Sequence, residues 1–184
     1  MSKLNVAVLV GSLRKESFSS QVANGLKIVA PDDMALTDVE IGDLPFYNPD
    51  LETDTPPQPW ARFRAEVAKA DAVIFVTPEY NRSVPAALKN ALDVGSRPYG
   101  KSVWGGKPAA VVSSSPGNIS GFGANHHLRQ SLVFLDMPTL QQPEAYLAQV
   151  DKLLDAKTGF VADTAKFMGM FMKTFDTFAR KNIG

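Results

Sequence analysis

The chain has 184 residues, of which 45% are hydrophobic and 21% are charged, a composition that supports one globular domain over residues 1–184. Its 19 basic and 19 acidic side chains cancel, so no net charge draws the chain to nucleic acid or to an anionic membrane. The chain contains no cysteine, which excludes disulfides, thiolate nucleophiles, iron–sulfur clusters and cysteine zinc sites.

The sequence shows no sign of an export signal or a membrane span. The apolar run at residues 4–10 has the length of a strand and is followed by Gly11, Ser12 and charged residues rather than by a cleavage site. No stretch approaches the roughly 18 consecutive apolar residues that a membrane span needs. We therefore expect a cytoplasmic protein without a membrane segment.

Strand-like and helix-like segments alternate along the chain. Apolar runs predict strands at residues 4–10, 34–41, 71–78, 107–114 and 137–141. Apolar residues at helical spacing, together with helix start and stop signals, predict helices at residues 17–30, 60–70, 85–94, 125–135 and 163–181. The proline-rich residues 45–59 predict a loop.

This alternation predicts an α/β fold, with a parallel sheet between helices on both faces. Five strands suit a flavodoxin-like doubly wound sheet of order 2-1-3-4-5 rather than a closed barrel, which needs eight strands. Such a sheet binds ligands beyond the carboxyl ends of its strands, where the strand order reverses. The candidate functional segments are therefore the loops at residues 11–19, 78–85 and 113–123.

The loop at residues 11–19 leads into a helix N-terminus, where free N–H groups and the helix dipole attract anions. Ser12, Ser17 and Ser19 add hydroxyl groups and Arg14 adds a guanidinium, a set of donors that suits a phosphate monoester. The loop has neither G-x-x-x-x-G-K-[ST] nor G-x-G-x-x-G, which argues against a P-loop and a dinucleotide fingerprint. Simple N-capping by serine is the alternative interpretation.

The other two loops suit a flat polar ring. Two prolines stiffen residues 78–85, where Tyr80 offers an aromatic plane and Asn81 offers hydrogen bonds. Residues 113–123 are rich in glycine, which lets backbone approach a ring closely, and Ser115 is a candidate donor to a ring carbonyl. Either loop alone would also fit an ordinary turn, but the three together match FMN, in which a phosphate is joined to a planar ring.

These segments resemble the NAD(P)H-dependent FMN reductases, and within them the bacterial chromate and quinone reductases. The matching motifs occur in order over residues 4–144: GSLRKESF at 11–18, TPEYN at 77–81, SVP at 83–85, LKNALD at 88–93 followed by Ser96 and Arg97, GKP at 106–108, SSSPG at 113–117 and LRQ at 128–130. One departure is the pair Val94 and Gly95, where the family often has tryptophan after the aspartate.

The resemblance implies a flavodoxin-like fold, bound FMN, and a homodimer or homotetramer with the flavin near an interface. The phosphate pocket would fall on Ser12, Arg14, Ser17, Phe18 and Ser19. The ring contacts would fall on Pro78, Glu79, Tyr80, Asn81, Ser115 and Gly117. Asn81 and Arg97 are the candidate substrate-binding residues, with Arg97 attracting an anionic acceptor or the phosphate of the donor; a surface ion pair is the alternative role for Arg97.

The implied activity is two-electron reduction of quinones by NADPH or NADH, in a ping-pong cycle in which hydride passes through N5 of the flavin. Chromate, ferric complexes, azo dyes and free flavins are further acceptors that the resemblance implies. No side chain is assigned a catalytic acid–base role, because the flavin carries the redox chemistry. The alternatives are a flavodoxin-type electron carrier, which zero net charge disfavours, a flavin-binding protein without efficient NAD(P)H turnover, and a member of the fold that binds no flavin.

Neither a metal site nor a hydrolase site is expected. His126 and His127 are neighbours on a predicted helix and point about 100° apart, which makes them a poor metal-binding pair. No G-x-S-x-G motif surrounds any serine. The helically spaced phenylalanines and methionines between Phe167 and Phe178 predict a core or subunit-interface face rather than a ligand pocket.

Overall fold

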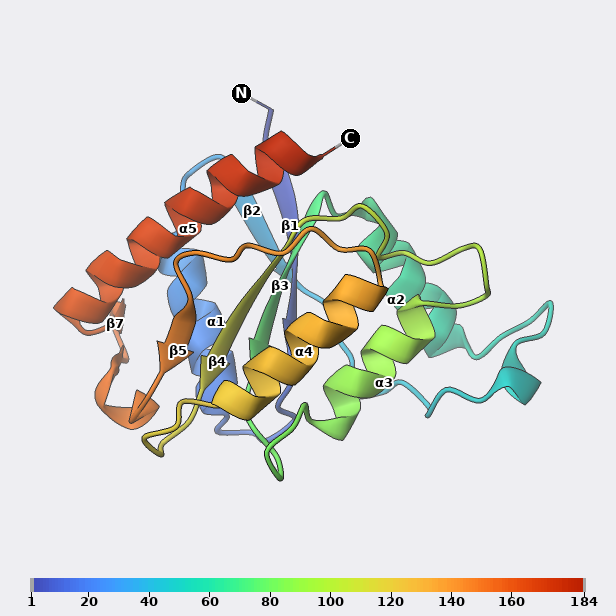
Figure 1. Cartoon of the computed structure of the whole chain (residues 1–184), viewed down its shortest axis with the longest axis horizontal. Coiled ribbons are helices and arrows are strands. Elements are labelled where there is room, and N and C mark those ends of the chain that lie inside the picture. The colour runs from blue at the N-terminus through green and yellow to red at the C-terminus, as the bar shows by residue number, and fades with distance from the viewer. Residues whose placement is uncertain (1, 184) are drawn as a thin grey trace.

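The computed structural model describes residues 2–183 and shows a five-stranded parallel sheet between two layers of helices (Figure 1). Its strands are β1 (Leu4–Val10), β2 (Met34–Asp38), β3 (Ala72–Thr77), β4 (Ala109–Ser114) and β5 (Ala145–Leu147). They are ordered β2-β1-β3-β4-β5, and every pair is parallel. The predicted flavodoxin-like sheet and its strand order are confirmed.

Within residues 2–183, five α-helices and a few short elements complete the fold. The helices are α1 (Phe18–Val29), α2 (Gln58–Lys69), α3 (Ala86–Gly95), α4 (Phe122–Phe134) and α5 (Ala162–Asn182). The short elements are the 3-10 turns η1 (Pro49–Leu51) and η2 (Val150–Lys152) and a small antiparallel pair, β6 (Leu154–Asp155) and β7 (Gly159–Phe160). The hairpin near residues 154–160 was not anticipated from the sequence.

Side chains alternate between the two faces of the sheet, so each central strand contributes to two cores. Ile74 packs in the core under α1 and α5, whereas the next residue, Phe75, packs in the core under α2, α3 and α4. Every residue of β3 and β4 is buried. Burial on both faces explains why these strands read as continuous apolar runs rather than as alternating patterns.

The predicted fifth strand at residues 137–141 is wrong. Thr139 forms only an isolated bridge with Ala109, at the start of β4, and the paired strand is β5, which lies opposite residues 112–114. Pro138 and Pro143 both lack the N–H that a continuous ladder needs. The chain therefore touches the sheet once at Thr139 and joins it again farther along β4.

The last helix, α5, forms part of the core. Met168, Phe171, Met172 and Phe175 are buried in the cluster beneath α1 and α5, as the helical spacing predicted. In the described part of the chain, no helix has both the length and the apolar composition needed to cross a bilayer.

The departure at Val94 and Gly95 has a packing explanation. Gly95 ends α3 against the fully buried Trp104, and a Cβ on Gly95 would lie 2.5 Å from the indole ring. Trp104 also donates a hydrogen bond of 3.0 Å from its Nε1 to the carbonyl of Leu92. A tryptophan from the following loop thus fills the space beside the end of α3.

Candidate functional site

A cleft of about 810 Å³ opens at the carboxyl ends of β1, β3 and β4, the edge at which a doubly wound sheet binds its ligands. Its walls are the β1–α1 loop, the β3–α3 loop, the start of α3 and the residues that follow β4. In Figure 1 these loops lie at the bottom of the view, at the far end of the sheet from both termini. The volume is within the usual range of small-molecule sites, about 300–1,000 Å³.

The structure brings most of the predicted site residues together in this cleft. Ser12, Arg14, Ser17, Phe18, Ser19, Pro78, Tyr80 and Asn81 all line it. Glu79, Ser115 and Gly117 do not line it, although their neighbours Ser114 and Pro116 do. Three residues at the start of α3 also contribute, namely Ala86, Ala87 and Lys89; their place directly after the SVP motif was the signal in the sequence that could have identified them.

The first wall is built around the N-terminus of α1. The buried Ser17 is the N-cap, and its hydroxyl accepts a hydrogen bond of 3.2 Å from the amide of Ser20. The capping interpretation therefore holds for Ser17. The amides of Phe18 and Ser19 have no partner within the helix, because the first turn of any helix leaves its N–H groups free. No acidic residue lies in this turn, so its positive dipole end can accept an anion.

Arg14 lies at the mouth of the cleft beside this helix end. Its guanidinium donates a hydrogen bond of 2.7 Å from Nη2 to the carbonyl of Glu16. The same group lies over the ring of Phe18, 5.6 Å from its centroid, within the range of a cation–π contact. Two weak contacts thus hold an exposed cation next to the free amides of α1.

The second wall contains a tight two-residue turn. Tyr80 and Ser83 exchange two backbone hydrogen bonds of 3.0 and 2.9 Å. The residues between them, Asn81 and Arg82, both have left-handed backbones, with φ of 46° and 64°, as a type I′ turn requires. The turn presents Tyr80 and Asn81 to the cleft.

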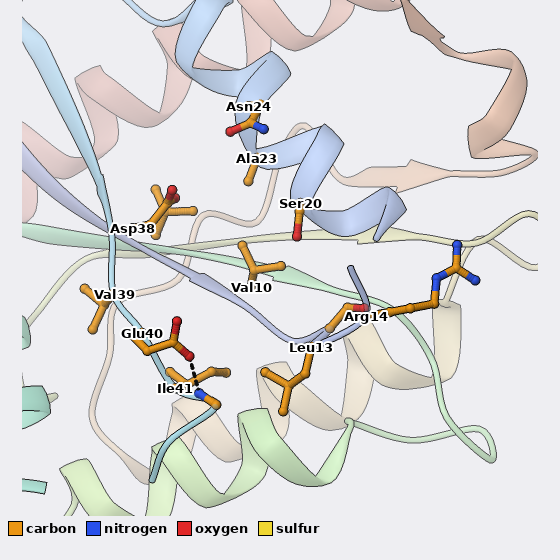
Figure 2. A pocket seen from close by; sticks show the side chains of 13 residues that line it. Val10, Leu13, Arg14, Ser20, Ala23, Asn24, Asp38, Val39, Glu40 and Ile41 are labelled. Carbon is orange, nitrogen blue, oxygen red and sulfur yellow. Dashed lines mark hydrogen bonds between the residues drawn. The ribbon is translucent and has the colours of Figure 1, made fainter. Parts of the chain in front are cut away.

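The charges of the lining distinguish this cleft from its neighbour. Among residues 2–183, no Asp or Glu lines the cleft, whereas Arg14 and Lys89 do. The adjoining hollow of about 610 Å³ beside β2 shares Arg14 with the cleft but is also lined by the carboxylates of Asp38 and Glu40 (Figure 2). Arg14 extends away from both carboxylates in this view. An anionic phosphate therefore fits the cleft and is disfavoured in the hollow.

Two predicted residues stabilise loops with their side chains. Glu79 accepts a hydrogen bond of 3.1 Å from the amide of Ala124, at the start of α4. Ser115 accepts one of 3.0 Å from the amide of Gly117. Neither side chain is directed at the cleft, so any contact with a ring in the cleft would come from the backbone.

Arg97 lies in a separate hollow of about 350 Å³ between α3 and α4. Its guanidinium donates weak hydrogen bonds of 3.4 and 3.5 Å to the carbonyl and hydroxyl oxygens of Ser96. Lys89 lines both this hollow and the main cleft and forms an ion pair of 2.8 Å with Asp93. Arg97 is therefore placed beside the cleft rather than in it.

The two histidines have different partners. His126 shares a hydrogen bond of 3.0 Å with the hydroxyl of Tyr146, and His127 shares one of 3.0 Å with the hydroxyl of Ser83. Burial raises the pKa of Tyr146 to about 12, and its hydrogen bond to Glu144 adds to the effect. Over residues 2–183, no three side chains of His, Asp or Glu gather as potential metal ligands.

Comparison with known proteins identifies the family. Residues 4–152 match the model of the family described as NADPH-dependent FMN reductase. The chain belongs to the NADPH-dependent FMN reductase family. It is 58% identical over 178 residues to a quinone reductase of Pseudomonas putida, covering 97% of this chain and 96% of that protein. It is 44% identical over 178 residues to a 2-hydroxy-1,4-benzoquinone reductase of a Burkholderia species, covering 96% and 97%.

A solved structure agrees with this assignment. The flavoenzyme FerB of Paracoccus denitrificans, an NAD(P)H:acceptor oxidoreductase, superimposes with a TM-score of 0.91 at 39% identity, covering 97% of this chain and 98% of that one. As a member of the FMN reductase family, the chain is an oxidoreductase that uses FMN and NAD(P)H. The cleft fits FMN: its free amides and Arg14 suit a phosphate, and the uncharged turn residues Tyr80 and Asn81 suit a polar ring.

Proposed function

We propose that this FMN reductase reduces quinones, taking two electrons from NADPH or NADH in a ping-pong cycle with FMN held in the 810 Å³ cleft. The observation that carries the proposal is the cleft itself, which joins a helix N-terminus flanked by Arg14 to the uncharged turn residues Tyr80 and Asn81, with no carboxylate among the described residues that line it. The names of the two bacterial relatives, both quinone reductases, support a quinone as the acceptor.

Each wall of the cleft has a distinct role in this proposal. When bound, FMN supplies the redox chemistry by accepting a hydride from NAD(P)H and passing two electrons to the acceptor. Ser12, Arg14 and the first-turn amides of Phe18 and Ser19 hold the phosphate. The sequence PEYN at residues 78–81, with the backbone around Ser115 and Gly117, holds the ring.

Two further residues act on the substrate. Asn81, which lines the cleft, contacts the quinone or the nicotinamide above the ring. Arg97, in the neighbouring hollow, attracts anionic acceptors or the phosphates of the donor through its charge. The apolar residues that lead into α3, Val84 to Ala87, limit the access of water to this side of the cleft.

We also propose a cytoplasmic homodimer or homotetramer. NAD(P)H is a reductant of the cytoplasm, which supports that location. Phe134, at the end of α4, is 86% exposed, and Val133 and Tyr99 are exposed as well, so a second copy would have apolar side chains to cover. Size-exclusion chromatography with light scattering gives the mass directly: 19.9 kDa per particle would contradict the proposal, and a dimeric or tetrameric mass would support it.

An anaerobic visible spectrum tests the reaction. Purified protein is saturated with FMN and then treated in turn with NADPH, NADH and a benzoquinone. Flavin bands that bleach with a nicotinamide and return with quinone are the expected result, and the two bleaching rates rank the donors. Chromate replaces the quinone in a parallel sample. Bands that never bleach would instead favour an electron carrier or a flavin-binding protein without turnover.

A further inference from the structure

The turn that presents Tyr80 and Asn81 to the cleft is attached to α4 by residues outside the cleft. Glu79, just before the turn, directs Oε2 at the amide of Ala124, 3.1 Å away. Its Oε1 accepts a hydrogen bond of 3.1 Å from the guanidinium of Arg82. The Glu79 carboxylate therefore bonds both to Arg82, within the two-residue turn, and to Ala124, in the first helical turn of α4.

The start of α4 needs this partner. Its N-cap is Gly121, in a left-handed conformation with φ of 71°, and it has no side-chain cap. The amides of the first turn of a helix have no partner within the helix, and a carboxylate at this end is also favoured by the helix dipole. Glu79 supplies that acceptor to Ala124 from 45 residues away in the sequence.

Two more contacts join the same surfaces. A Cβ on Gly123 would lie 2.6 Å from the carbonyl oxygen of Arg82 and 3.0 Å from Oε2 of Glu79. The hydroxyl of Ser83 shares a hydrogen bond of 3.0 Å with Nδ1 of His127, one helical turn farther along α4. The turn thus rests directly on the backbone of α4, and only glycine at position 123 permits that approach.

The turn itself requires support. Asn81 and Arg82 both have positive φ without being glycine, a conformation that costs free energy and persists where its surroundings determine it. The Glu79 side chain is only 12% exposed, whereas that of Arg82 is 69% exposed. The largely buried carboxylate of Glu79, rather than the solvated guanidinium of Arg82, therefore fixes the turn against α4.

We propose that Glu79 is a positioning residue for the flavin ring, which caps α4 and thereby holds Tyr80 and Asn81 at the cleft before the cofactor binds. The inference rests on the proposed function, since it assumes that this turn binds the ring. The proposal gives the two ends of the cleft different roles. Arg14 and the start of α1 bind the phosphate, whereas Glu79 affects only binding of the ring, through the turn.

Comparison of FMN with riboflavin, which has the ring and lacks the phosphate, tests this separation. The dissociation constants of both flavins are measured by fluorescence titration of the folded apoprotein. If the turn of Glu79→Ala has the conformation that binds the ring in about a tenth of the molecules, the dissociation constants of FMN and riboflavin both rise about tenfold. Their ratio stays that of the wild type. Arg14→Ala, in contrast, changes this ratio.

Three further variants sharpen the test. Glu79→Gln keeps an oxygen that accepts from Ala124 and is expected to bind both flavins within about twofold of wild type, because most of the competent population is retained. Gly123→Ala moves the turn away from α4 without replacing Glu79, because the new Cβ meets the carbonyl oxygen of Arg82. It is expected to weaken the binding of FMN and of riboflavin by the same factor. Gly169→Ala, on α5, adds a methyl group where nothing lies within 4 Å and leaves both constants unchanged.

The outcomes distinguish this inference from the proposed function. A wild type that binds neither flavin contradicts the proposed function itself. A wild type that binds both, with Glu79→Ala affecting FMN alone or neither flavin, overturns the positioning role. A Glu79→Gln variant that binds both flavins as weakly as Glu79→Ala also overturns the positioning role, because the loss of affinity would then not come from the missing hydrogen bond to Ala124. If circular dichroism shows that Glu79→Ala does not fold, the result for Gly123→Ala decides between the same alternatives.

Discussion

Replacing Arg14 with alanine removes the only arginine that lines the cleft within residues 2–183. We expect the protein to remain folded, because Arg14 is exposed and its contacts are a single hydrogen bond to the carbonyl of Glu16 and a stacking contact with Phe18. The loss should appear in FMN binding, since the guanidinium lies beside the free amides of the first turn of α1.

The size of the effect follows from the hydrogen bonds that Arg14 makes with FMN bound and without it. A charge-assisted hydrogen bond to a phosphate contributes about 1.5–3 kcal/mol. We take the phosphate contact to replace the bond of 2.7 Å from Arg14 to the carbonyl of Glu16, which is worth about 0.5–1.5 kcal/mol. Taken low end from low end and high end from high end, the difference is about 1–1.5 kcal/mol, so the dissociation constant for FMN should rise by about 5- to 12-fold, at 1.4 kcal/mol per factor of ten.

Titration of the apoprotein with FMN, followed by flavin fluorescence, measures this constant. Lys15→Ala is the matched control, because Lys15 is the adjacent exposed cation and does not line the cleft. Riboflavin provides a second control, since it lacks the phosphate and its affinity should not depend on Arg14. Equal losses in the Arg14 and Lys15 variants, or FMN affinity that Arg14→Ala leaves unchanged, would refute the phosphate assignment.

Three other variants test separate parts of the structure. Arg97→Ala should raise KM for a sulfonated, anionic quinone more than for a neutral benzoquinone in steady-state assays, and equal changes for both would remove the proposed electrostatic role. Gly95→Ala should lower the free energy of unfolding by about 1–3 kcal/mol in urea titrations, because the new Cβ meets the buried ring of Trp104 at 2.5 Å; unchanged stability would mean that the ring can move. The pKa of Tyr146 is raised to about 12, so its proton is held more tightly in the folded state and stability should fall as pH rises from about 10 to 12. Tyr146→Phe should flatten this part of the pH–stability curve, and identical alkaline slopes would contradict the shift.

The sheet and the location of the site could be predicted because they depend on local patterns. Continuous apolar runs mark strands that are buried on both faces, and alternation with helices leads to a parallel doubly wound sheet. That topology places the loops after β1, β3 and β4 at one edge. Ser12, Arg14, Tyr80 and Asn81 accordingly lie in one cleft. The position of β5 could not be predicted in this way, because residues 137–141 and 145–147 are both apolar enough and only pairing along β4 chooses between them.

The amino-acid sequence by itself determined the α/β fold, the strand order and the three loops that form the cleft. The tertiary structure alone decided where individual polar side chains point. Ser17 caps its own helix, Glu79 caps α4, and Arg97 lies in a neighbouring hollow. The physical reason is that apolar burial follows a regular period along the chain, whereas a polar side chain takes whichever donor or acceptor the folded backbone brings within about 3 Å.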